Sequence, residues 1–415
     1  MANTKFSGWR VAVGCFLIMF AVQGALQTFS IFLPAIVNDT GFTTTQISMV
    51  STIACAIAFA LNMVIGAMIK KMGVKTVLII GIVTGSLGYV VAAYVPGLFG
   101  IYLGAVMNGV AVGLATIASC SVIVSNWFIR SHGTVLAVVM AGAMIFGITL
   151  FPVYGILIEN MGWRNAYVIL CIMEAAIALF ATFFLVIEHP DKKGQKPLGW
   201  EEQQKLAAEM ANAEGTDISV IRKHRSFYLI LIGIVLLGLA TNCENFLPSF
   251  WQGNGMGQAQ SSNYMSIYSG ICAVASIILG RIADKLNARV FQAITSICFI
   301  AAIILFAVTQ TIVPGLVIVL CVIFAFGAKK TTSMIPPIVL RYSFGRKDYA
   351  KVAGFGAGMI QLGIAISNPI LGSLRDATGD YRIPFFTGAA IALVAFLILQ
   401  IAMGTSPYKG GTRKA

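Results

Sequence analysis

The chain has 415 residues, of which 58% are hydrophobic and only 10% are charged, whereas roughly 25% of the residues in a soluble domain are charged. This composition excludes an ordinary soluble fold, because a globule of this size has too little interior to hide so much apolar surface. The net charge of +13 does not indicate nucleic-acid binding, since the basic residues form short clusters between apolar runs and no continuous stripe.

Apolar runs of about 20 residues, the length that crosses a bilayer, follow one another along the chain. The first continues to about Ile36 without a small-residue cleavage site, so it is expected to be an uncleaved span. The sequence therefore predicts an all-α membrane protein with twelve transmembrane helices, centred near Val22, Ala58, Thr84, Val110, Met144, Ile177, Val235, Ile271, Ile300, Ile323, Ile364 and Leu393.

The longest polar stretch, residues 189–225, lies between the sixth and seventh predicted spans. We interpret it as a cytoplasmic linker loop between an N-terminal six-helix half, residues 1–188, and a C-terminal six-helix half, residues 226–415. Lysines and arginines gather in alternate loops, and such loops face the cytoplasm. We therefore expect an integral protein of a bacterial plasma membrane with both termini in the cytoplasm.

The two predicted halves repeat each other. The loop Gly66-Ala-Met-Ile-Lys-Lys-Met-Gly-Val-Lys75 follows the second span, and Gly280-Arg-Ile-Ala-Asp-Lys-Leu-Asn-Ala-Arg289 follows the eighth. A second echo joins the segment from Gly155 to Arg164 with the segment from Gly372 to Arg382, after spans five and eleven. Two echoes at similar offsets predict two pseudo-symmetric halves.

These loops resemble the major facilitator superfamily, whose members carry G-x-x-x-D-(R/K)-x-G-(R/K)-(R/K) at both places. The second copy departs at Asn287 and Ala288, and the first has Lys70 where an acid is usual. The glycines would allow close helix contact. A basic loop that only sets topology explains Lys70 and Lys71 equally well. The resemblance implies a gating motif formed by Gly66, Lys70, Lys71, Gly73, Gly280, Asp284, Lys285 and Arg289.

Other residues resemble the monocarboxylate transporter and oxalate/formate antiporter branch of that superfamily. They are Gly8-Trp9, Asn126-Trp127-Phe128 with Gly133, Phe151-Pro152 and the turn from Asp376 to Tyr381. The charged positions that this branch uses in spans one, eight and eleven are missing, because span eight has no charge before Arg281 and span eleven offers Gln361. The resemblance implies transport of organic anions with the cationic centre elsewhere.

Two adjacent lysines, Lys329 and Lys330, lie inside the tenth predicted span, about 22 Å along it at 1.5 Å per residue. A lysine at such depth costs roughly 2.5 to 3.5 kcal/mol, so a compensating role is expected. We interpret the pair as an anion site in which an ammonium group meets a substrate carboxylate. The alternative is a structural pairing with a buried acid, either Glu174 or Glu244.

The resemblance also implies that spans one, four, seven and ten line a central cavity. Each polar residue there could instead join two helices by a hydrogen bond. Glu244 and Glu174 are candidates for coupling transport to protons. The further substrate-binding candidates, beside the two lysines, are Gln23, Gln27, Asn108, Asn242, Tyr268 and Gln361.

The sequence thus predicts a secondary active transporter of small organic anions, with carboxylates as the expected class, working by alternating access with proton coupling or anion exchange. The alternative is a major facilitator efflux pump for drugs or other hydrophobic compounds. No catalytic cluster, metal-ligand spacing or nucleotide-binding motif indicates an enzyme, a metal or a cofactor. The expected partners are the anion, the lipid bilayer and either protons or a counter-anion, with no nucleic acid, and the chain is expected to act as a monomer.

Overall fold

The computed structural model describes residues 6–129, 131–202, 215–309, 314–345 and 349–408, and at residues 202, 284, 314, 328–333 and 349–351 it describes the backbone alone. These ranges are largely helical and contain no β-strand, only two isolated bridges, Phe128 with Leu198 and Gly215 with Gly345.

The N-terminal half of the chain begins with an interrupted helix. It consists of α1 (Gly8–Ile18), a π-helical turn η1 (Met19–Gln23), α2 (Gly24–Gln27) and α3 (Phe29–Thr40). The following helices are α4 (Thr44–Met72), α5 (Val74–Tyr94), α6 (Gly97–Leu114), α7 (Ile117–Trp127) and α8 (His132–Phe180), which runs into a second π-helical turn, η2 (Ala181–Leu185). Two short 3-10 turns, η3 (Pro190–Lys193) and η4 (Trp200–Glu202), come next.

The C-terminal half also contains an interrupted helix. After α10 (Ile218–Ile221), α11 (Arg225–Thr241) passes through the 3-10 segment η5 (Asn242–Phe246) into α12 (Leu247–Gly253). The remaining helices are α13 (Gln258–Lys285), α14 (Ala288–Val308), α15 (Pro314–Ser333), α16 (Ile335–Phe344), α17 (Tyr349–Thr378) and α18 (Arg382–Gly404).

The helices confirm the twelve predicted crossings. Within the described residues, ten stretches are long and apolar enough to span a membrane, and Gly315–Gly327 is a shorter apolar helix. One of the ten, His132–Leu185, has 54 residues, and an unbroken helix of that length would be about 80 Å long. It turns at Gly162, whose φ of 79° and ψ of 160° are not helical, and so supplies two crossings.

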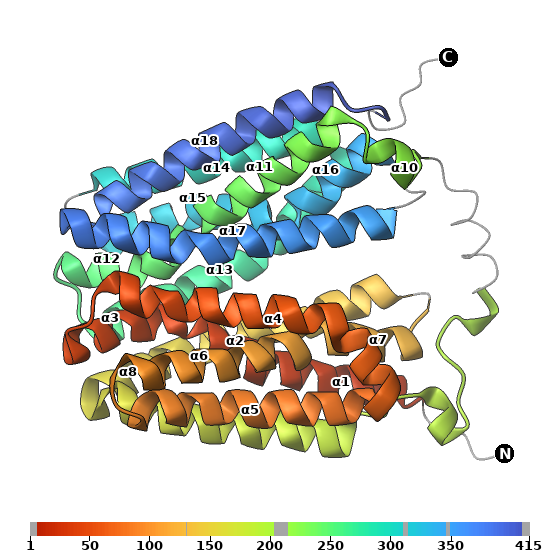
Figure 1. Ribbon diagram of the computed structural model, residues 1–415, viewed down its shortest axis with the longest axis horizontal. Helices are drawn as coiled ribbons and strands as arrows, with labels where there is room; N and C mark the ends of the chain where they lie inside the picture. The colour runs from red at the N-terminus through yellow and green to blue at the C-terminus, as the bar shows by residue number, and fades with distance from the viewer. Residues whose placement is uncertain (1–5, 130, 203–214, 310–313, 346–348, 409–415) are drawn as a thin grey trace. The chain divides into compact units, whose positions relative to one another are not determined.

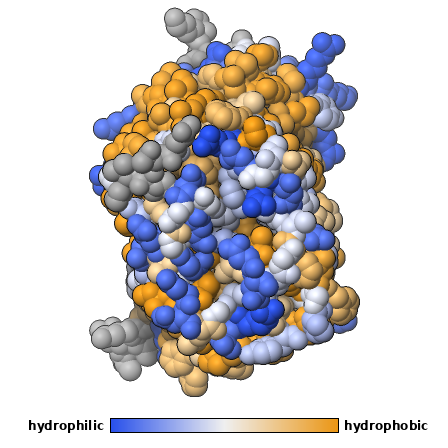
Figure 2. Space-filling model, turned by 90° about the vertical axis from the view of Figure 1, so that its left-hand side faces the viewer, coloured by the Kyte–Doolittle hydropathy of each residue, from blue (hydrophilic) through white to orange (hydrophobic). Residues whose placement is uncertain are grey.

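Many large apolar side chains point away from the protein interior. Met63, Phe99 and Ile277 are each more than 60% exposed, and this exposure suits contact with lipid, in which apolar side chains need no burial. Figure 2 shows the ends of the helices, where polar residues gather across the face and hydrophobic residues occupy its upper and lower margins. The chain is an integral membrane protein.

The chain packs into two compact units. Unit 1 contains Met1–Thr40, Ile53–Leu206 and Gln258–Ser266, and unit 2 contains Gly41–Thr52, Ala207–Gly257 and Ile267–Ala415. The first residues of α4 therefore belong to unit 2, and those of α13 belong to unit 1. The division into halves around residues 189–225 stays a prediction, and residues 203–214 of that stretch lie outside the described residues.

Each unit has its own apolar core. In unit 1, α5 packs against α6 and α8 (Figure 1), and the buried core includes Leu78 and Trp127. In unit 2, α11 packs against α17 and α18 (Figure 1), and the core includes Ile230, Val339 and Leu399. These packed helices position the polar side chains of the candidate functional site.

Candidate functional site

The seventh span is interrupted in unit 2, where η5 replaces regular α-helix between α11 and α12. Pro248 lies in the first turn of α12, where its missing N–H costs least. A break in a spanning helix frees backbone groups, and such breaks are tolerated only where protein or a water-filled cavity satisfies them. Transporters place their substrate sites at discontinuous helices of this kind.

Several candidate residues meet at this break. The Tyr268 hydroxyl of α13 donates to Oε2 of Glu244 at 2.9 Å. Asn245 donates to Oδ1 of Asn242 at 2.8 Å, and Asn242 donates to the Ile364 carbonyl oxygen of α17 at 3.3 Å. We call Asn242, Glu244, Asn245 and Tyr268 the polar cluster of unit 2. It unites three residues that the sequence analysis proposed for different reasons.

Helix α15 lies against this cluster. The ring of Tyr268, which is 1% exposed, has its centroid 5.6 Å from that of Phe324 on α15. Lys329 and Lys330 follow Phe324 on the same helix, about 8 Å further along its axis. Their side chains lie outside the described residues, so the lysine anion site stays a prediction.

The remaining amide candidates are distributed over both units. Gln361 is half-buried on α17, one turn before Ile364. Gln23 and Gln27 are half-buried in unit 1, where Gln23 ends the π-helical turn η1. Single π-helical turns inside α-helices frequently occur at functional sites, a feature that the sequence pattern did not reveal.

Two further candidates lie in the packing between α5, α6 and α8 of unit 1. The amide oxygen of Asn108 lies 3.2 Å from the position that a Cβ on Gly88 would take. Glu174 accepts a hydrogen bond from the Ser86 hydroxyl at 3.1 Å and is 1% exposed. Both side chains are turned toward a neighbouring helix, but the amide oxygen of Asn108 is buried without a hydrogen-bond partner among the described residues, so no helix-joining hydrogen bond is seen at that oxygen.

The N-terminus of α5 receives a carboxylate that the sequence analysis missed. Oε1 of Glu188, just beyond η2, accepts from the backbone N–H of Lys75 at 3.1 Å, and Oε2 pairs with Lys192. Partial burial raises the pKa of Glu188, but the hydrogen bonds from Lys192 and Lys75 outweigh it, so that the pKa lies below the ordinary value of 4.5. The available signal was an acid directly after the last apolar residue of a span.

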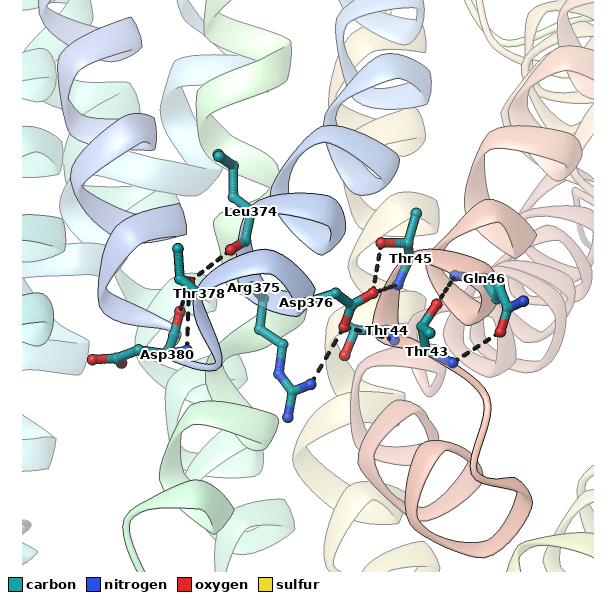
Figure 3. Close-up of polar contacts among 9 residues, drawn as sticks. All are labelled: Thr43, Thr44, Thr45, Gln46, Leu374, Arg375, Asp376, Thr378 and Asp380. Carbon is teal, nitrogen blue, oxygen red and sulfur yellow. Dashed lines mark hydrogen bonds and ion pairs between the residues drawn. The ribbon is translucent and has the colours of Figure 1, made fainter.

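A second carboxylate caps the start of α4 within unit 2 (Figure 3). Asp376 of α17 accepts from the backbone N–H groups of Thr44 and Thr45 at 3.0 and 2.7 Å, and from the Thr45 hydroxyl at 2.6 Å. Thr43 and Gln46 form a reciprocal capping box at the same helix end. A carboxylate at this end also meets the positive pole of the helix dipole.

Comparison with known proteins gives the family. The family model described as Major Facilitator Superfamily matches residues 15–343. The chain belongs to the major facilitator superfamily.

Curated relatives of this superfamily member are transporters. It is 23% identical to monocarboxylate transporter 1 of Bos taurus over 433 residues, which cover 96% of this chain and 85% of that protein. It is also 23% identical to MFS-type transporter 1 of Ophiocordyceps sp. (strain BCC 1869), with 96% of this chain and 86% of that protein covered. Proteins of this family are membrane transporters and are generally not enzymes.

Solved structures agree with the fold of this superfamily member. The nucleoside transporter NupG matches with a TM-score of 0.75 at 16% identity, covering 95% of this chain and 98% of that chain. A bacterial homolog of the human lysosomal transporter Spinster matches with a TM-score of 0.75 at 14% identity, covering 97% and 98%. The likeness confirms a twelve-helix major facilitator fold.

The superfamily motif lies at helix ends in this structure and does not form loops: Gly66, Lys70 and Lys71 lie on α4, and Gly280 and Lys285 lie on α13. Among the described residues, a Cβ on Gly66 or Gly280 would meet no atom within 4 Å, so the close helix contact expected at these glycines is not seen. Lys70, Lys71 and Lys285 are exposed, and Gly73, with φ of 82°, separates α4 from α5.

The last motif residue, Arg289, donates to the side chain and carbonyl of Gln400 at 3.3 and 3.2 Å. Asn287, which stands where the superfamily motif has glycine, caps α14 by accepting from the Arg289 N–H at 3.0 Å. The side chain of Asp284 lies outside the described residues, and the gating role of the motif stays a prediction.

Proposed function

We propose that this chain moves small organic anions, carboxylates among them, across the membrane by alternating access. The observation that carries the proposal is the interruption of the seventh span at η5, where Tyr268 is hydrogen-bonded to Glu244, Asn245 is hydrogen-bonded to Asn242, and the Tyr268 ring packs against α15. Hydrogen-bonding side chains at a broken helix can replace the water that a polar solute loses inside the bilayer.

The charge for binding an anion comes from Lys329 and Lys330 on α15. An ammonium group that meets a carboxylate forms a charge-assisted hydrogen bond, which is stronger than a neutral one. Asn242 and Tyr268 would orient the rest of the solute. Relatives named as monocarboxylate transporters align with 95 to 96% of this chain, which supports carboxylates as the class.

Uptake by proteoliposomes tests the proposal. The assay measures uptake of a panel of labelled mono- and dicarboxylates by wild type and by three variants, Lys329→Gln, Lys330→Gln and Tyr268→Phe. Lys193→Gln, in the exposed linker, is the matched control. Loss of a hydrogen bond to a charged group costs about 1.5 to 3 kcal/mol, so one or both lysine variants should lose about ten- to a hundredfold in uptake at low substrate.

Tyr268→Phe should lose less, because it removes a partner of Glu244 and no charge. Normal uptake by both lysine variants would contradict the anion site. Extrusion of hydrophobic dyes by proteoliposomes that ignore every carboxylate would favour the efflux alternative.

The proposed orientation, with both termini in the cytoplasm, has its own test. A reporter enzyme active only in the cytoplasm is fused after Gly194, in the polar stretch between spans six and seven. Activity is expected, and a reporter active only when exported would reverse the topology.

A further inference from the structure

Glu174 is a buried acid that the polar cluster of unit 2 does not include. It lies on α8 in unit 1, 1% exposed, and its Oε1 accepts from the Ser86 hydroxyl of α5 at 3.1 Å. That oxygen would also lie 3.6 Å from a Cβ on Gly85, beside Ala111 of α6. The carboxyl group is therefore enclosed by three packed helices.

No cation compensates this acid within the described part of the chain. Its second oxygen, Oε2, is buried without a hydrogen-bond partner there, and so is the hydroxyl of Tyr89, one turn beyond Ser86 on α5. The titratable groups around it are phenols and a thiol: Tyr89 from α5, with Tyr154 and Cys171 from α8. Helix α6 contributes Ala111.

Such surroundings tolerate only the neutral acid. Removing an ionised carboxylate from water without a counter-charge is strongly unfavourable, and the single hydrogen bond from Ser86 offsets only part of that cost. Binding a proton to Oε2 removes the charge and gives the buried group a donor. Burial of Glu174 and binding of a proton are thus linked, since each favours the other.

We propose that Glu174 is the proton-binding site through which a pH gradient drives transport. The inference rests on the proposed function, because it names the coupling ion for that carrier. The step is a simple protonation: the carboxylate gains one proton from one side of the membrane while the packing is open, forming one O–H bond. It returns that proton to the other side when the packing opens again.

Aromatic contacts connect the acid with the first span. The Tyr89 and Tyr167 rings lie 5.3 Å apart, and Tyr167 stacks on Phe32 of α3 with a centroid separation of 4.2 Å. Phe32 also lies 6.2 Å from Tyr154. A shift of α3 during transport would therefore disturb the packing over Glu174, which gives the proton site a physical link to the moving helices.

The transport test compares wild type with Glu174→Gln in proteoliposomes. Glutamine keeps the shape and the acceptor for Ser86 but binds no proton. Wild type should accumulate a carboxylate about tenfold above protein-free liposomes for one unit of pH difference, alkaline inside. Glu174→Gln should exchange labelled for unlabelled substrate without accumulating it, and Glu201→Gln in the exposed η4 turn should behave as wild type.

Three other results are possible, and each contradicts either the proton site or the proposed function. Accumulation by Glu174→Gln at the wild-type level would make the acid merely structural. Exchange by wild type without any response to the pH gradient would exclude the proton site and leave carboxylate transport intact. Absence of both exchange and accumulation in wild type would overturn the proposed function.

A spectroscopic measurement tests whether Glu174 carries a proton, and it needs no substrate. Infrared difference spectra of the lipid-reconstituted protein at pH 7 should contain a protonated-carboxyl band that is lost in Glu174→Gln. The band should shift to higher frequency in Ser86→Ala, because the hydrogen bond to the carboxyl is removed. Identical spectra of wild type and Glu174→Gln in that region would overturn the inference even if the variant transported poorly.

Discussion

The seam between α11 and α17 in unit 2 allows a sharp test of helix packing. A Cβ on Gly363 would lie 3.0 Å from the Leu239 backbone nitrogen and still closer to the Val235 carbonyl oxygen. On the opposite helix, a Cβ on Gly238 would lie 2.5 Å from the Ile360 carbonyl oxygen, whereas ordinary contact begins at 3.4 Å. A methyl group on Gly238 would therefore push the helices apart by about 0.9 Å, and one on Gly363, which would come closer to its carbonyl oxygen, would push them further apart.

Gly363→Ala should therefore destabilise the protein. Forcing one extra methyl group into a packed interface costs about 1 to 3 kcal/mol, and alanine returns up to about 1 kcal/mol through its better helix propensity. The net loss of about 1 to 2 kcal/mol corresponds to a fall in apparent Tm of about 1 to 2 °C, because the entropy of unfolding grows with chain length. Transport should fall as well, because the same seam carries the Asn242 hydrogen bond to Ile364.

Gly354→Ala on the same helix is the matched control. Gly354 is exposed, and among the described residues its Cβ would meet no atom within 4 Å, so this variant should be neutral or slightly stabilised. Thermal unfolding in detergent can be followed with a thiol-reactive dye, since Cys15, Cys120 and Cys243 are among the free cysteines that are buried until the protein unfolds. An apparent Tm of Gly363→Ala equal to that of Gly354→Ala would refute the reasoning.

Two caps give the remaining predictions. Asp376→Ala should lower stability by about 0.5 to 2 kcal/mol, the usual effect of losing an N-cap, while Asp376→Asn, which retains one acceptor, should lose less; equal unfolding temperatures for both variants and wild type would exclude the cap. For Glu188, the folded-state pKa lies below 4.5, so its contribution is present above pH 4.5 and is lost as the pH falls through the folded-state value. The unfolding temperatures of wild type and Glu188→Gln should differ at pH 7 and converge at acid pH, and a difference that does not change with pH would contradict this charge-assisted capping.

The sequence predicted the spans well because a bilayer imposes a strong and local requirement, about 20 apolar residues in succession. All twelve predicted centres fall on helices, including Met144 and Ile177 on the two arms of α8. The interruptions at η1 and η5 were not predicted, because an apolar run reads the same whether its hydrogen bonds are α, π or 3-10. Asn242 and Glu244 were named as candidates from the sequence but were not connected with an interruption of the seventh span.

The candidate site was predicted in parts. Tyr268 and Glu244 were chosen for their residue types, but their hydrogen bond joins positions 24 residues apart, and no periodic pattern carries such information. The caps are harder still, since Asp376 and Thr45 are 331 residues apart in the chain. The depth of a residue in the membrane can be estimated by counting along its span, whereas its hydrogen-bond partners on other helices can be identified only from the packed structure.

The chain reversal at Gly162 decides where a tag or a cleavage site can be inserted into this protein. Helix residues continue on both sides of that single non-helical position, and the adjoining Trp163 and Arg164 side chains are both bound to Asp39. Because the turn is this short, an inserted protease site, epitope or glycosylation sequon would separate the two helical arms of α8. Insertions belong instead in the long polar stretch between spans six and seven, where Gly194 ends a short helical turn and both Lys193 and Gly194 are exposed.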